Sequence, residues 1–580
     1  MIPPVLSVDK LEIDARTPEG LKPVLKDVSF SLAASETLCI AGESGSGKSL
    51  TALSIMRLLS PSLKQRAGQI KLSGRELTTL SDAAMRKLRG GEIAMIFQDP
   101  MSSLNPVMTI GAQMTEAIRE HAGSPNAEKR ARDMLDAVHV SEAAKRLQQY
   151  PHELSGGMRQ RVMIGMALSC RPKVLIADEP TTALDVTVQA QILNLMRELK
   201  KEFSTSIILI THDMGVVAEM ADRVALLHQG SLVEQGKVAD IFERPQQDYT
   251  KRLLAAVPHL GSYRGTDEPR RLTPGKTSSS HETVLWVKDL TVSYGSASGP
   301  SWRREQPKPV VRNVSFELKA GQTLGLVGES GSGKSTTGKA VLRLVLSTGD
   351  IVINGVNTAG LSRTAMKPLR RQVQMIFQDP YASLDPRMAV GEAIAEPLVI
   401  HGIGTREQRR DKVMALLKRV RLEPEHATRY PHEFSGGQRQ RICIARALAL
   451  EPKIIVADES VSALDVSVRG QVLDLMQELQ EQMHIAYIFI SHDMAVIERM
   501  SHFVAVMKAG EIVEYGTRRS VFEAPTHPYT RSLMEAVPRG YPALRSRVSG
   551  DRFVDMQNAG PHTATPAVAP SPKRPTHEKA

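Results

Sequence analysis

The sequence contains the same glycine-rich run twice, and each run has the residue types that bind a phosphate group. GESGSGKS spans residues 42–49 and returns at residues 328–335, and both runs fit the pattern G-x-x-x-x-G-K-[ST]. Each run follows an apolar strand pattern and precedes a helical pattern, which is the context that such a loop requires. Glycines let backbone N–H groups turn toward phosphate oxygens, and the helix N-terminus adds its positive dipole end. Two matches in the same context predict two nucleotide sites.

Individual residues of these loops have expected roles. The lysine of each loop would reach the β- and γ-phosphates, and the hydroxyl of the last serine would ligate Mg²⁺. The residues expected to line the two nucleotide sites are Gly42, Ser44, Gly45, Gly47, Lys48 and Ser49 in the first copy, and Gly328, Ser330, Gly331, Gly333, Lys334 and Ser335 in the second.

An acidic pair ends an apolar strand pattern in each copy, in VLIADEP and in IIVADES. A buried strand rarely ends in two carboxylates unless something cationic lies there. Asp178 and Asp458 are therefore expected to hold the Mg²⁺ shell, directly or through water. Glu179 and Glu459 are expected to polarise the attacking water. A lone pair of this kind is more often a solvated strand end, but the upstream phosphate loop favours catalysis.

A histidine and a glutamine recur with each acidic pair. His212 and His492 each follow a strand pattern and lie 33 residues after the glutamate of their copy, where a sensor of the γ-phosphate is expected. Gln98 and Gln378, both in the run IFQDP, are expected to contact Mg²⁺ or water in a loaded site. Phosphoryl transfer needs little covalent help, so positioning and charge stabilisation by such groups would carry most of the catalysis.

These motifs belong to an internal repeat that divides the chain. From Gln98 onward the two copies keep a constant offset of 280 residues, whereas the two loop lysines are 286 residues apart. The repeat predicts a first domain at residues 5–260 and a second at residues 283–540. Residues 261–282, rich in Gly, Ser, Thr and Pro, have the composition of a flexible linker. Residues 541–580 are expected to form a disordered tail.

The pattern of apolar runs predicts the fold class. Short β-rich runs such as KVLIADE and SIILITHD alternate with helical patterns, which predicts an α/β fold with a mostly parallel sheet between helices. At 580 residues the chain is too long for one core, because single cores stop growing beyond roughly 250–300 residues. Hydrophobic residues make up 41% and charged residues 24%, as in globular proteins rather than disordered or membrane-embedded ones.

No segment of the sequence predicts secretion or a membrane span. The N-terminus MIPPVLSVDK lacks a basic n-region and an apolar h-region, and no apolar run approaches the roughly 18 residues that cross a bilayer. We therefore expect the chain to stay in the cytosol and to reach a membrane only through a partner. Three scattered cysteines argue against disulfides, zinc or an iron–sulfur cluster. The formal charge of +11 is attributed to a surface excess of Lys and Arg rather than to a nucleic-acid partner.

Two further runs point to a family. LSGGMRQR at residues 154–161 and FSGGQRQR at residues 434–441 resemble the signature of ATP-binding-cassette (ABC) ATPases. The order of motifs resembles that family too: phosphate loop, glutamine, signature, acidic strand, the tripeptide ALD (183–185 and 463–465), and histidine. The resemblance covers nearly the whole chain apart from linker and tail. It implies two tandem P-loop NTPase (ABC) domains, each with a mostly parallel core sheet and a helical signature subdomain.

In the ABC family two cassettes pair head to tail, and each ATP lies between one phosphate loop and the signature of the other domain. A signature at a helix N-terminus offers a hydroxyl, N–H groups and a dipole to the γ-phosphate, and this interaction ends when that phosphate leaves. The resemblance implies that ATP joins the halves and hydrolysis releases them, which transmits force to a permease. The residues implied to share a nucleotide are Lys48 with Ser435, Gly437 and Gln438, and Lys334 with Ser155, Gly157 and Met158.

A finer resemblance is to the dipeptide/oligopeptide importer ATPases. IFQDPMSSLNP (96–106), IFQDPYASLDP (376–386) and the closing segments DYTKRLLAAVP (248–258) and HPYTRSLMEAVP (527–538) are typical of them, although such a closing segment read alone is a turn plus an amphipathic helix. The fused arrangement resembles ATPases of glutathione import and of peptide-antibiotic uptake. The resemblance implies an importer of small peptides at the cytoplasmic face of the inner membrane, with two transmembrane permease subunits and a periplasmic solute-binding protein. The direction of transport rests on this resemblance alone.

The contact with the permease is expected beside the glutamine. In the family a cytoplasmic helix of each permease subunit docks in a groove at that place. Met101, Leu104, Tyr381 and Leu384 could line this groove, or they could be ordinary packing residues.

Three departures from the family pattern distinguish the two copies. Asp14 and Ala15 stand in the first copy where Tyr294 of the second copy is expected to stack on adenine, and losing such stacking would cost roughly 1–3 kcal/mol by analogy with base–aromatic contacts. Met158 replaces the usual glutamine of the signature, and Ser460 replaces the usual proline after the acidic pair. Both catalytic glutamates remain, so we predict two hydrolytic sites of unequal affinity.

Soluble twin-cassette proteins that act on ribosomes are the alternative class. Those proteins join their cassettes by a long, charged, helical linker, whereas this linker is short and rich in Gly, Ser and Pro. Twin-cassette DNA-repair ATPases need zinc-binding CxxC pairs, which the sequence lacks.

Overall fold

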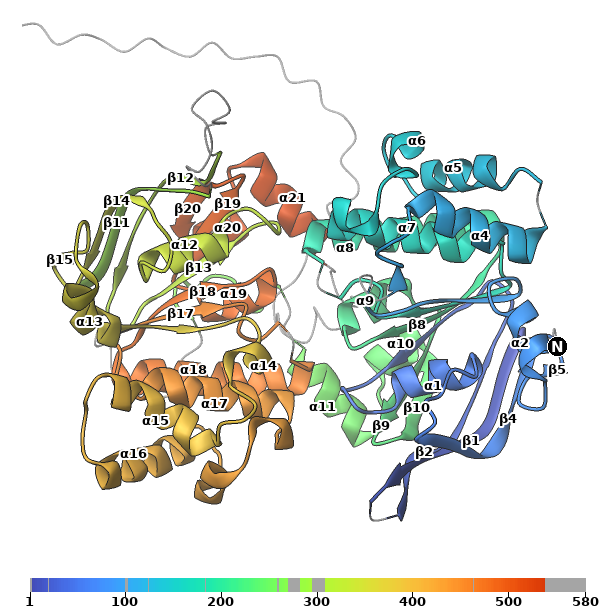
Figure 1. Ribbon diagram of the computed structural model, residues 1–580, viewed down its shortest axis with the longest axis horizontal. Helices are drawn as coiled ribbons and strands as arrows, with labels where there is room; N and C mark the ends of the chain where they lie inside the picture. Colours follow the sequence, from blue (N-terminus) through green and yellow to red (C-terminus); the bar gives the residue numbers. More distant parts are fainter. Residues whose placement is uncertain are drawn as a thin grey trace, which may run out of the picture.

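The computed structural model describes most of the chain as two similar halves that lie side by side (Figure 1), called here the first and second copy. The described residues are 3–18, 20–99, 103–123, 125–182, 184–257, 260–269, 282–294, 308–462 and 464–537. The tail predicted at 541–580 and most of the predicted linker therefore lie outside the described residues.

The first copy is built on a ten-stranded sheet. Its central strands are buried throughout and apolar except at their ends, as expected for parallel strands covered by helices on both faces. Strands β9, β3, β8, β7 and β6 pair in parallel, and the strands beyond β10 form an antiparallel wing. The strand order is β5 (Arg75–Glu76), β4 (Leu63–Leu72), β1 (Leu6–Thr17), β2 (Gly20–Leu32), β10 (Ser231–Lys237), β9 (Arg223–His228), β3 (Thr37–Ala41), β8 (Ser206–Thr211), β7 (Val174–Asp178) and β6 (Ile93–Ile96).

The second copy has the same order of strands, divided between two sheets. The larger sheet runs β16 (Val373–Ile376), β17 (Ile454–Asp458), β18 (Ala486–Ile490), β13 (Thr323–Val327), β19 (Phe503–Lys508) and β20 (Glu511–Thr517). The antiparallel sheet runs β12 (Pro309–Lys319), β11 (Thr283–Ser293), β14 (Thr348–Ile353) and β15 (Val356–Asn357). Both copies thus confirm the α/β class with a mostly parallel core sheet.

Helices cover both faces of each sheet and form a separate lobe around the signature runs (Figure 1). In the first copy they are α1 (Lys48–Ile55), α2 (Asp82–Leu88), α4 (Ile110–Ala122), α5 (Ala127–Ala137), α6 (Ala143–Arg146), α7 (Gly156–Leu168), α8 (Val186–Phe203), α9 (Met214–Met220), α10 (Val238–Glu243) and α11 (Asp248–Ala256). In the second copy they are α12 (Lys334–Val341), α13 (Arg363–Gln372), α14 (Pro380–Ser383), α15 (Val390–Ile400), α16 (Arg406–Arg419), α17 (Gly436–Leu448), α18 (Val466–Met483), α19 (Met494–Met500), α20 (Arg518–Glu523) and α21 (Pro528–Ala536).

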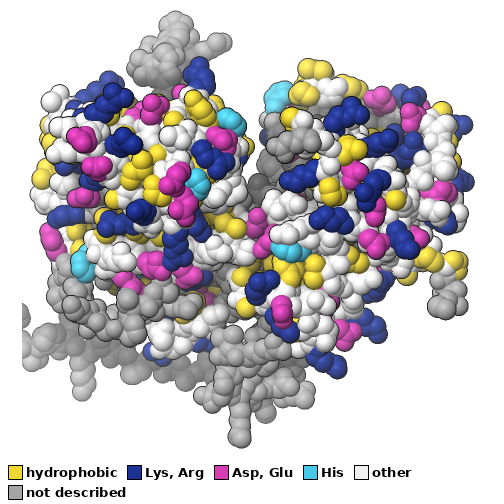
Figure 2. Space-filling model, turned by 90° about the horizontal axis from the view of Figure 1, so that it is seen from below, with side chains coloured by type: hydrophobic (Ala, Val, Ile, Leu, Met, Phe, Trp, Pro, Cys, Tyr) yellow, Lys and Arg dark blue, Asp and Glu magenta, His cyan; other side chains and the backbone are white. Residues whose placement is uncertain are grey.

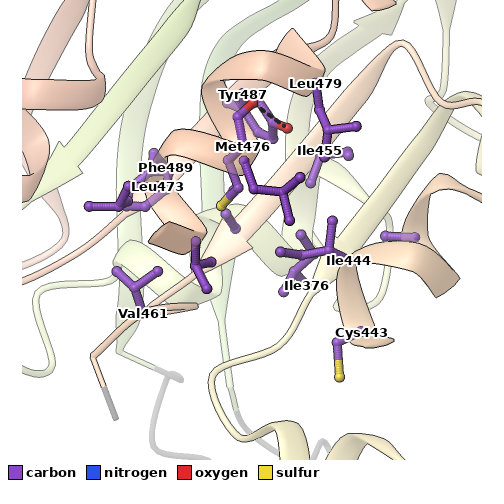
Figure 3. Close-up of a cluster of buried hydrophobic side chains, with 14 of the residues drawn as sticks. Ile376, Cys443, Ile444, Ile455, Val461, Leu473, Met476, Leu479, Tyr487 and Phe489 are labelled. Atoms are coloured by element: carbon purple, nitrogen blue, oxygen red, sulfur yellow. Dashed lines mark hydrogen bonds between the residues drawn. The ribbon is translucent and has the colours of Figure 1, made fainter. Parts of the chain in front are cut away.

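Alternation along the central strands divides each core into two clusters. In β17, Ile455 and Ala457 belong to the cluster beneath α17 and α18 (Figure 3), whereas Ile454 and Val456 belong to the cluster on the opposite face. Successive strand side chains point to opposite faces, so a strand buried on both sides must be apolar at every position. Cys443 of α17 lies buried in the first of these clusters.

Residues 261–269, the longer of the two described parts of the predicted linker, lie on the second copy. The Gly261 N–H donates to Glu498 Oε2 (2.7 Å) and the Gly265 N–H donates to Glu523 Oε1 (2.6 Å). The buried Arg518 guanidinium hydrogen bonds to this segment as well. On the face seen in Figure 2, Lys and Arg side chains are interspersed with Asp and Glu rather than gathered into one basic patch.

Candidate active sites

The predicted site residues collect at one edge of each parallel sheet. In the first copy the phosphate loop follows β3, the acidic pair ends β7, His212 follows β8 and Gln98 follows β6. These four strands are neighbours in the sheet, and the carboxyl ends of parallel strands meet at the same edge. The second copy repeats this arrangement on β13, β17, β18 and β16. Segments far apart in the sequence therefore form one site in each copy.

The phosphate loop of the first copy closes around its lysine. Lys48 Nζ donates to the carbonyl oxygens of Gly42 (2.9 Å) and Glu43 (2.8 Å). Gly42 has φ 143°, and a Cβ there would lie 2.1 Å from the Leu227 carbonyl oxygen, so a larger residue does not fit. Gly47 is the N-cap of α1, so the positive end of the helix dipole faces the loop. Ser44 and Gly45 form the turn between these points.

The loop of the second copy has the same geometry. Lys334 Nζ donates to the carbonyl oxygens of Gly328 (2.8 Å) and Glu329 (2.7 Å). Gly333 is the N-cap of α12, and Ser330 and Gly331 lie in the intervening turn. Both lysines therefore rest on their own loops, at the place where phosphate oxygens would compete for the ammonium group.

A serine and an aspartate meet beside each lysine. Ser49 Oγ donates to Asp178 Oδ1 (3.1 Å), and Ser335 Oγ donates to Asp458 Oδ1 (2.7 Å). Burial raises the pKa of both aspartates, because a buried carboxylate is disfavoured without a cation. A hydroxyl with one carboxylate suits Mg²⁺, which is usually held by one or two carboxylates together with substrate phosphates.

In the first copy Glu179 is held by three side chains. Gln98 Nε2 and Thr182 Oγ1 both donate to Glu179 Oε2, at 3.0 and 2.8 Å, and His212 Nδ1 lies 3.0 Å from Oε1. Burial opposes ionisation, but the hydrogen bonds and charge of His212, followed by Thr182 and Lys48, lower the pKa of Glu179 to about 2. Its φ is 48°, a conformation that non-glycine residues adopt uncommonly and that clusters at functional sites.

Glu459 of the second copy has the same backbone but fewer close contacts. Its φ is 45°. Gln378 Nε2 donates to Glu459 Oε2 (2.7 Å), and His492 Nδ1 lies 3.5 Å from Oε1. Ser462, at the position of Thr182, donates instead to the Glu459 carbonyl oxygen (2.9 Å). Burial opposes ionisation here too, but the hydrogen bond and the charge of His492, followed by the charge of Lys334, lower the pKa of Glu459.

The signature serines are helix N-caps. Ser155 Oγ accepts from the Met158 N–H (3.3 Å) at the start of α7, and Ser435 Oγ accepts from the Gln438 N–H (3.4 Å) at the start of α17. At α17 the Gln438 side chain also accepts from the Ser435 N–H (3.0 Å), which completes a capping box. The side chain of Met158 has no amide group, so the capping box at α7 is only half formed. The glycines that follow the serines, Gly157 and Gly437, lie against α8 and α18.

The two copies meet head to tail at the first phosphate loop. The Ser44 N–H donates to Asp465 Oδ1 (2.6 Å), and Ser467 Oγ donates to Glu43 Oε1 (2.5 Å). Asp465 and Ser467 belong to the second copy, at the start of α18. The first phosphate loop therefore contacts the segment that follows the acidic strand of the other copy.

Carboxylates of both copies lie near the lysine of each phosphate loop. Burial lowers the pKa of each loop lysine, and carboxylates of both copies oppose that shift. Within its own copy each lysine is influenced by the glutamate of the acidic pair. The carboxylates contributed by the other copy are Asp465 for Lys48 and Asp185 for Lys334. The electrostatic pairing is thus reciprocal, as head-to-tail packing requires.

Family models confirm this interpretation of the sequence. The ABC transporter model matches residues 25–182 and 311–462, and the model of the oligopeptide/dipeptide transporter C-terminal region matches residues 233–282 and 513–555. The chain belongs to the ABC transporter ATPases. It therefore binds and hydrolyses ATP, and it is the ATP-hydrolysing subunit of an ABC transporter.

Similar proteins match this chain over nearly its whole length. The glutathione import ATP-binding protein GsiA of Salmonella paratyphi A is 54% identical over 592 residues, covering 97% of this chain and 95% of the relative. GsiA of Escherichia coli (strain K12) is 55% identical over 566 residues, covering 93% of this chain and 90% of the relative. Among solved structures, the dimeric structure of a bacterial ABC transporter cassette is 30% identical and covers 40% of this chain and 99% of its own, with a TM-score of 0.37.

Other predicted residues of this ABC ATPase lie as follows. Tyr294 is half exposed at the end of β11, whereas Asp14 of the first copy is buried in β1. Leu104 and Leu384 are buried core residues, so their assignment to a permease groove is wrong and the packing alternative holds. Tyr381 is exposed, with the Arg439 guanidinium 3.6 Å from its ring centroid, and Met101 lies outside the described residues. Among the described residues, no helix combines the length and apolar character needed to cross a membrane.

Sequence reasoning missed several residues that the structure brings to the sites. Thr182 was not assigned a role, although its hydroxyl contacts Glu179. Asp465 was quoted only as part of the ALD run, although it contacts the opposite phosphate loop. The tyrosines of the two closing segments, Tyr249 and Tyr529, also contact the phosphate loops. The signal for these two was the repetition of the dipeptide YT in both copies.

Proposed function

We propose that the chain energises the import of glutathione or closely related small peptides. The observation that carries this proposal is the 54% identity over 97% of the chain to a protein named glutathione import ATP-binding protein. The C-terminal region typical of oligopeptide and dipeptide transporters, matched in both copies, supports a peptide-like solute.

We assign the steps of hydrolysis to residues of the two sites. Lys48 and Lys334 leave their loop carbonyl oxygens and bind the β- and γ-phosphates of ATP. Glu179 and Glu459, ionised and oriented by their glutamine and histidine neighbours, align the attacking water. Because the geometry repeats in both copies, both sites are assigned hydrolytic activity.

The residues that would hold Mg²⁺ are a serine, an aspartate and a glutamine in each copy. When bound, the cation neutralises charge on the phosphate oxygens. The serine–aspartate pairs already lie within hydrogen-bond distance, and each glutamine contacts the glutamate that follows this aspartate in the sequence. The assigned groups are Ser49, Asp178 and Gln98 in the first copy, and Ser335, Asp458 and Gln378 in the second.

The signatures complete the sites across the interface. Lys48 is proposed to share its nucleotide with Ser435, Gly437 and Gln438, and the contact of Ser44 with Asp465 supports this pairing. The equivalent set for Lys334 is Ser155, Gly157 and Met158. His212 and His492 are proposed to sense the γ-phosphate, and Tyr294 to stack on adenine in the second site.

The proposed assembly contains two transmembrane permease subunits and a periplasmic solute-binding protein, with this chain at the cytoplasmic face of the inner membrane. The relatives named for glutathione import support this placement. Residues 5–260 and 283–540 are proposed as the two cassettes, joined through residues 261–282.

Uptake by cells tests the proposed solute. Cells that lack the gene would receive wild type, the double variant Lys48→Ala/Lys334→Ala, or Lys201→Ala as a control that removes an exposed lysine of α8. We expect wild type and Lys201→Ala to restore uptake of labelled glutathione, and the double variant to leave it at background. Restoration of labelled dipeptide uptake without glutathione uptake would refute glutathione and keep a peptide importer. If neither glutathione uptake nor dipeptide uptake depends on the gene, the proposed solute class is refuted.

A further inference from the structure

The closing helices α11 and α21 each contact three parts of the molecule: their own copy, the phosphate loop of that copy, and the other copy. Each follows the last strand of its own copy, and each packs against the first long helix after the acidic strand of the other copy, α18 for α11 and α8 for α21. Figure 1 shows both helices at the junction between the two halves. They are short, at nine residues each, so tertiary contacts rather than intrinsic helix propensity must hold them.

Each closing helix is fixed to its own copy by one glutamate. Glu234 of β10 accepts from the N–H groups of Gln246 (2.9 Å) and Gln247 (3.1 Å) just before α11. Glu514 of β20 accepts from the N–H groups of Thr526 (2.7 Å) and His527 (3.2 Å) just before α21. A carboxylate at this place satisfies N–H groups that the helix cannot and favours the positive end of its dipole.

The second residue of each closing helix is a tyrosine whose hydroxyl reaches the phosphate loop. Tyr249 Oη accepts a hydrogen bond from the Glu43 N–H (3.3 Å), and Tyr529 Oη accepts one from the Glu329 N–H (3.0 Å). Both tyrosines are buried. Burial, with the charges of Glu43 and Asp465 nearby, raises the pKa of Tyr249 to about 12, so the hydroxyl stays neutral.

This contact is repeated although the surroundings of the two rings differ. The Tyr249 ring stacks on His228 with centroids 4.1 Å apart, whereas the Tyr529 ring lies 4.6 Å from the Lys508 ammonium. Packing around the rings has therefore diverged between the copies, while the bond from hydroxyl to loop N–H is retained.

The loop residue that donates its N–H to the tyrosine also accepts a hydrogen bond from the loop lysine. The Glu43 carbonyl oxygen accepts from Lys48 Nζ (2.8 Å), and the Glu43 carboxylate accepts from Ser467 of the other copy (2.5 Å). In the second copy the Glu329 carbonyl oxygen accepts from Lys334 Nζ (2.7 Å). One residue in each loop thus links the closing helix to the group that binds phosphate.

We propose that Tyr249 and Tyr529 are positioning residues for ATP, each fixing its own phosphate loop from a helix that packs on the opposite cassette. The role rests on the proposed binding of phosphate by Lys48 and Lys334. Without the hydroxyl, the partly buried N–H of the loop loses its partner, and the loop must be ordered by ATP itself. Affinity for ATP falls at the site of the altered tyrosine and stays the same at the other.

Site-resolved photolabelling of the full chain with 8-azido-ATP tests this role, with the labelled half identified from its peptides. We expect Tyr249→Phe to raise the concentration for half-maximal labelling of the first half roughly fivefold, the factor for losing one neutral hydrogen bond, without changing the second half. Tyr529→Phe should do the reverse. Tyr487→Phe is the matched control, because it removes a buried hydroxyl that donates to the Met476 carbonyl oxygen in the core.

The variant Lys48→Ala separates the two proposals. Loss of labelling in the first half of this variant supports the phosphate-binding role, and retained labelling refutes that role. If Lys48→Ala abolishes labelling while Tyr249→Phe behaves like Tyr487→Phe, the positioning role is refuted. A shift of equal size in both halves of Tyr249→Phe would refute it as well, because a general loss of stability acts without regard to site.

Discussion

The two ATP sites have the same phosphate loop, acidic pair, glutamine and histidine, and they differ in what surrounds these residues. The glutamate of the first site is held by Gln98, Thr182 and His212 at 2.8–3.0 Å. The glutamate of the second site is contacted by Gln378 at 2.7 Å, with His492 at 3.5 Å. The groups that do chemistry are thus repeated, and the difference lies in the residues that orient them.

A second difference lies at the interface. Asp465 accepts from the first phosphate loop and gives no cap to its own helix α18. Its counterpart Asp185 caps α8 by accepting from the Val188 N–H (3.0 Å). Equivalent aspartates therefore stabilise different structures, one the contact between cassettes and the other a helix. Inequality between the sites can arise without any change in the catalytic set.

The largest effect is expected at the signature glycines. A Cβ at Gly437 would lie 2.2 Å from Val468 Cγ1, whereas a Cβ at Gly157 would lie 2.9 Å from Val188 Cγ1. Gly437→Ala should lower the free energy of unfolding by about 1–3 kcal/mol through overpacking. Gly157→Ala should cost less, because its Cβ would approach the neighbouring valine less closely, and the helix propensity of alanine offsets part of the cost at both positions. Thermal unfolding of the full chain measures both.

Adding Val468→Ala to Gly437→Ala is the control for that prediction. The double variant removes the clashing methyl groups and should recover most of the lost stability. An equal cost at both glycines would show that the two signature helices pack alike.

The next largest difference in the free energy of unfolding is expected between variants of Asp185 and Asp465. Asp185→Ala should lower the free energy of unfolding by about 1 kcal/mol, because α8 loses its N-cap. Asp465→Ala should lower it less, because this side chain caps no helix N–H in the structure. Denaturant unfolding measures both variants, and a reversed order would contradict the different roles assigned to the two residues.

The smallest effect is expected at the third residue of each signature helix. Met158→Gln should add about 0.5 kcal/mol of stability by completing the capping box at α7. Gln438→Met should remove a similar amount from α17, where the box is present. Unchanged unfolding temperatures in both variants would show that the box does not distinguish the two halves.

Much of each site was predictable because it is coded locally. Glycine spacing predicted the phosphate loops, and apolar runs ending in polar residues predicted the carboxyl edge of the sheet, where Glu179 and His212 lie 3.0 Å apart. Such features depend on neighbouring residues and on strand direction alone.

Contacts between distant segments were not predictable in the same way. The bond from Tyr249 to Glu43 depends on where α11 packs, and the contact of Asp465 with Ser44 depends on the pairing of the two copies. The hypothesis that Leu104 lines a permease groove could not be tested from the sequence, because an apolar loop residue has the same sequence pattern whether its side chain faces solvent or the core. In the structure the side chain is buried. These facts follow from tertiary packing, which a single sequence does not specify by local pattern.

ATP turnover by the full chain with Glu179→Gln, Glu459→Gln or both tests most directly the claim of two working, unequal sites. We expect each single variant to lose part of the turnover, by different amounts, and the double variant to fall at least about 100-fold, the usual contribution of a group that activates the attacking water. Turnover at the wild-type level in Glu179→Gln would contradict the claim that the first site hydrolyses ATP.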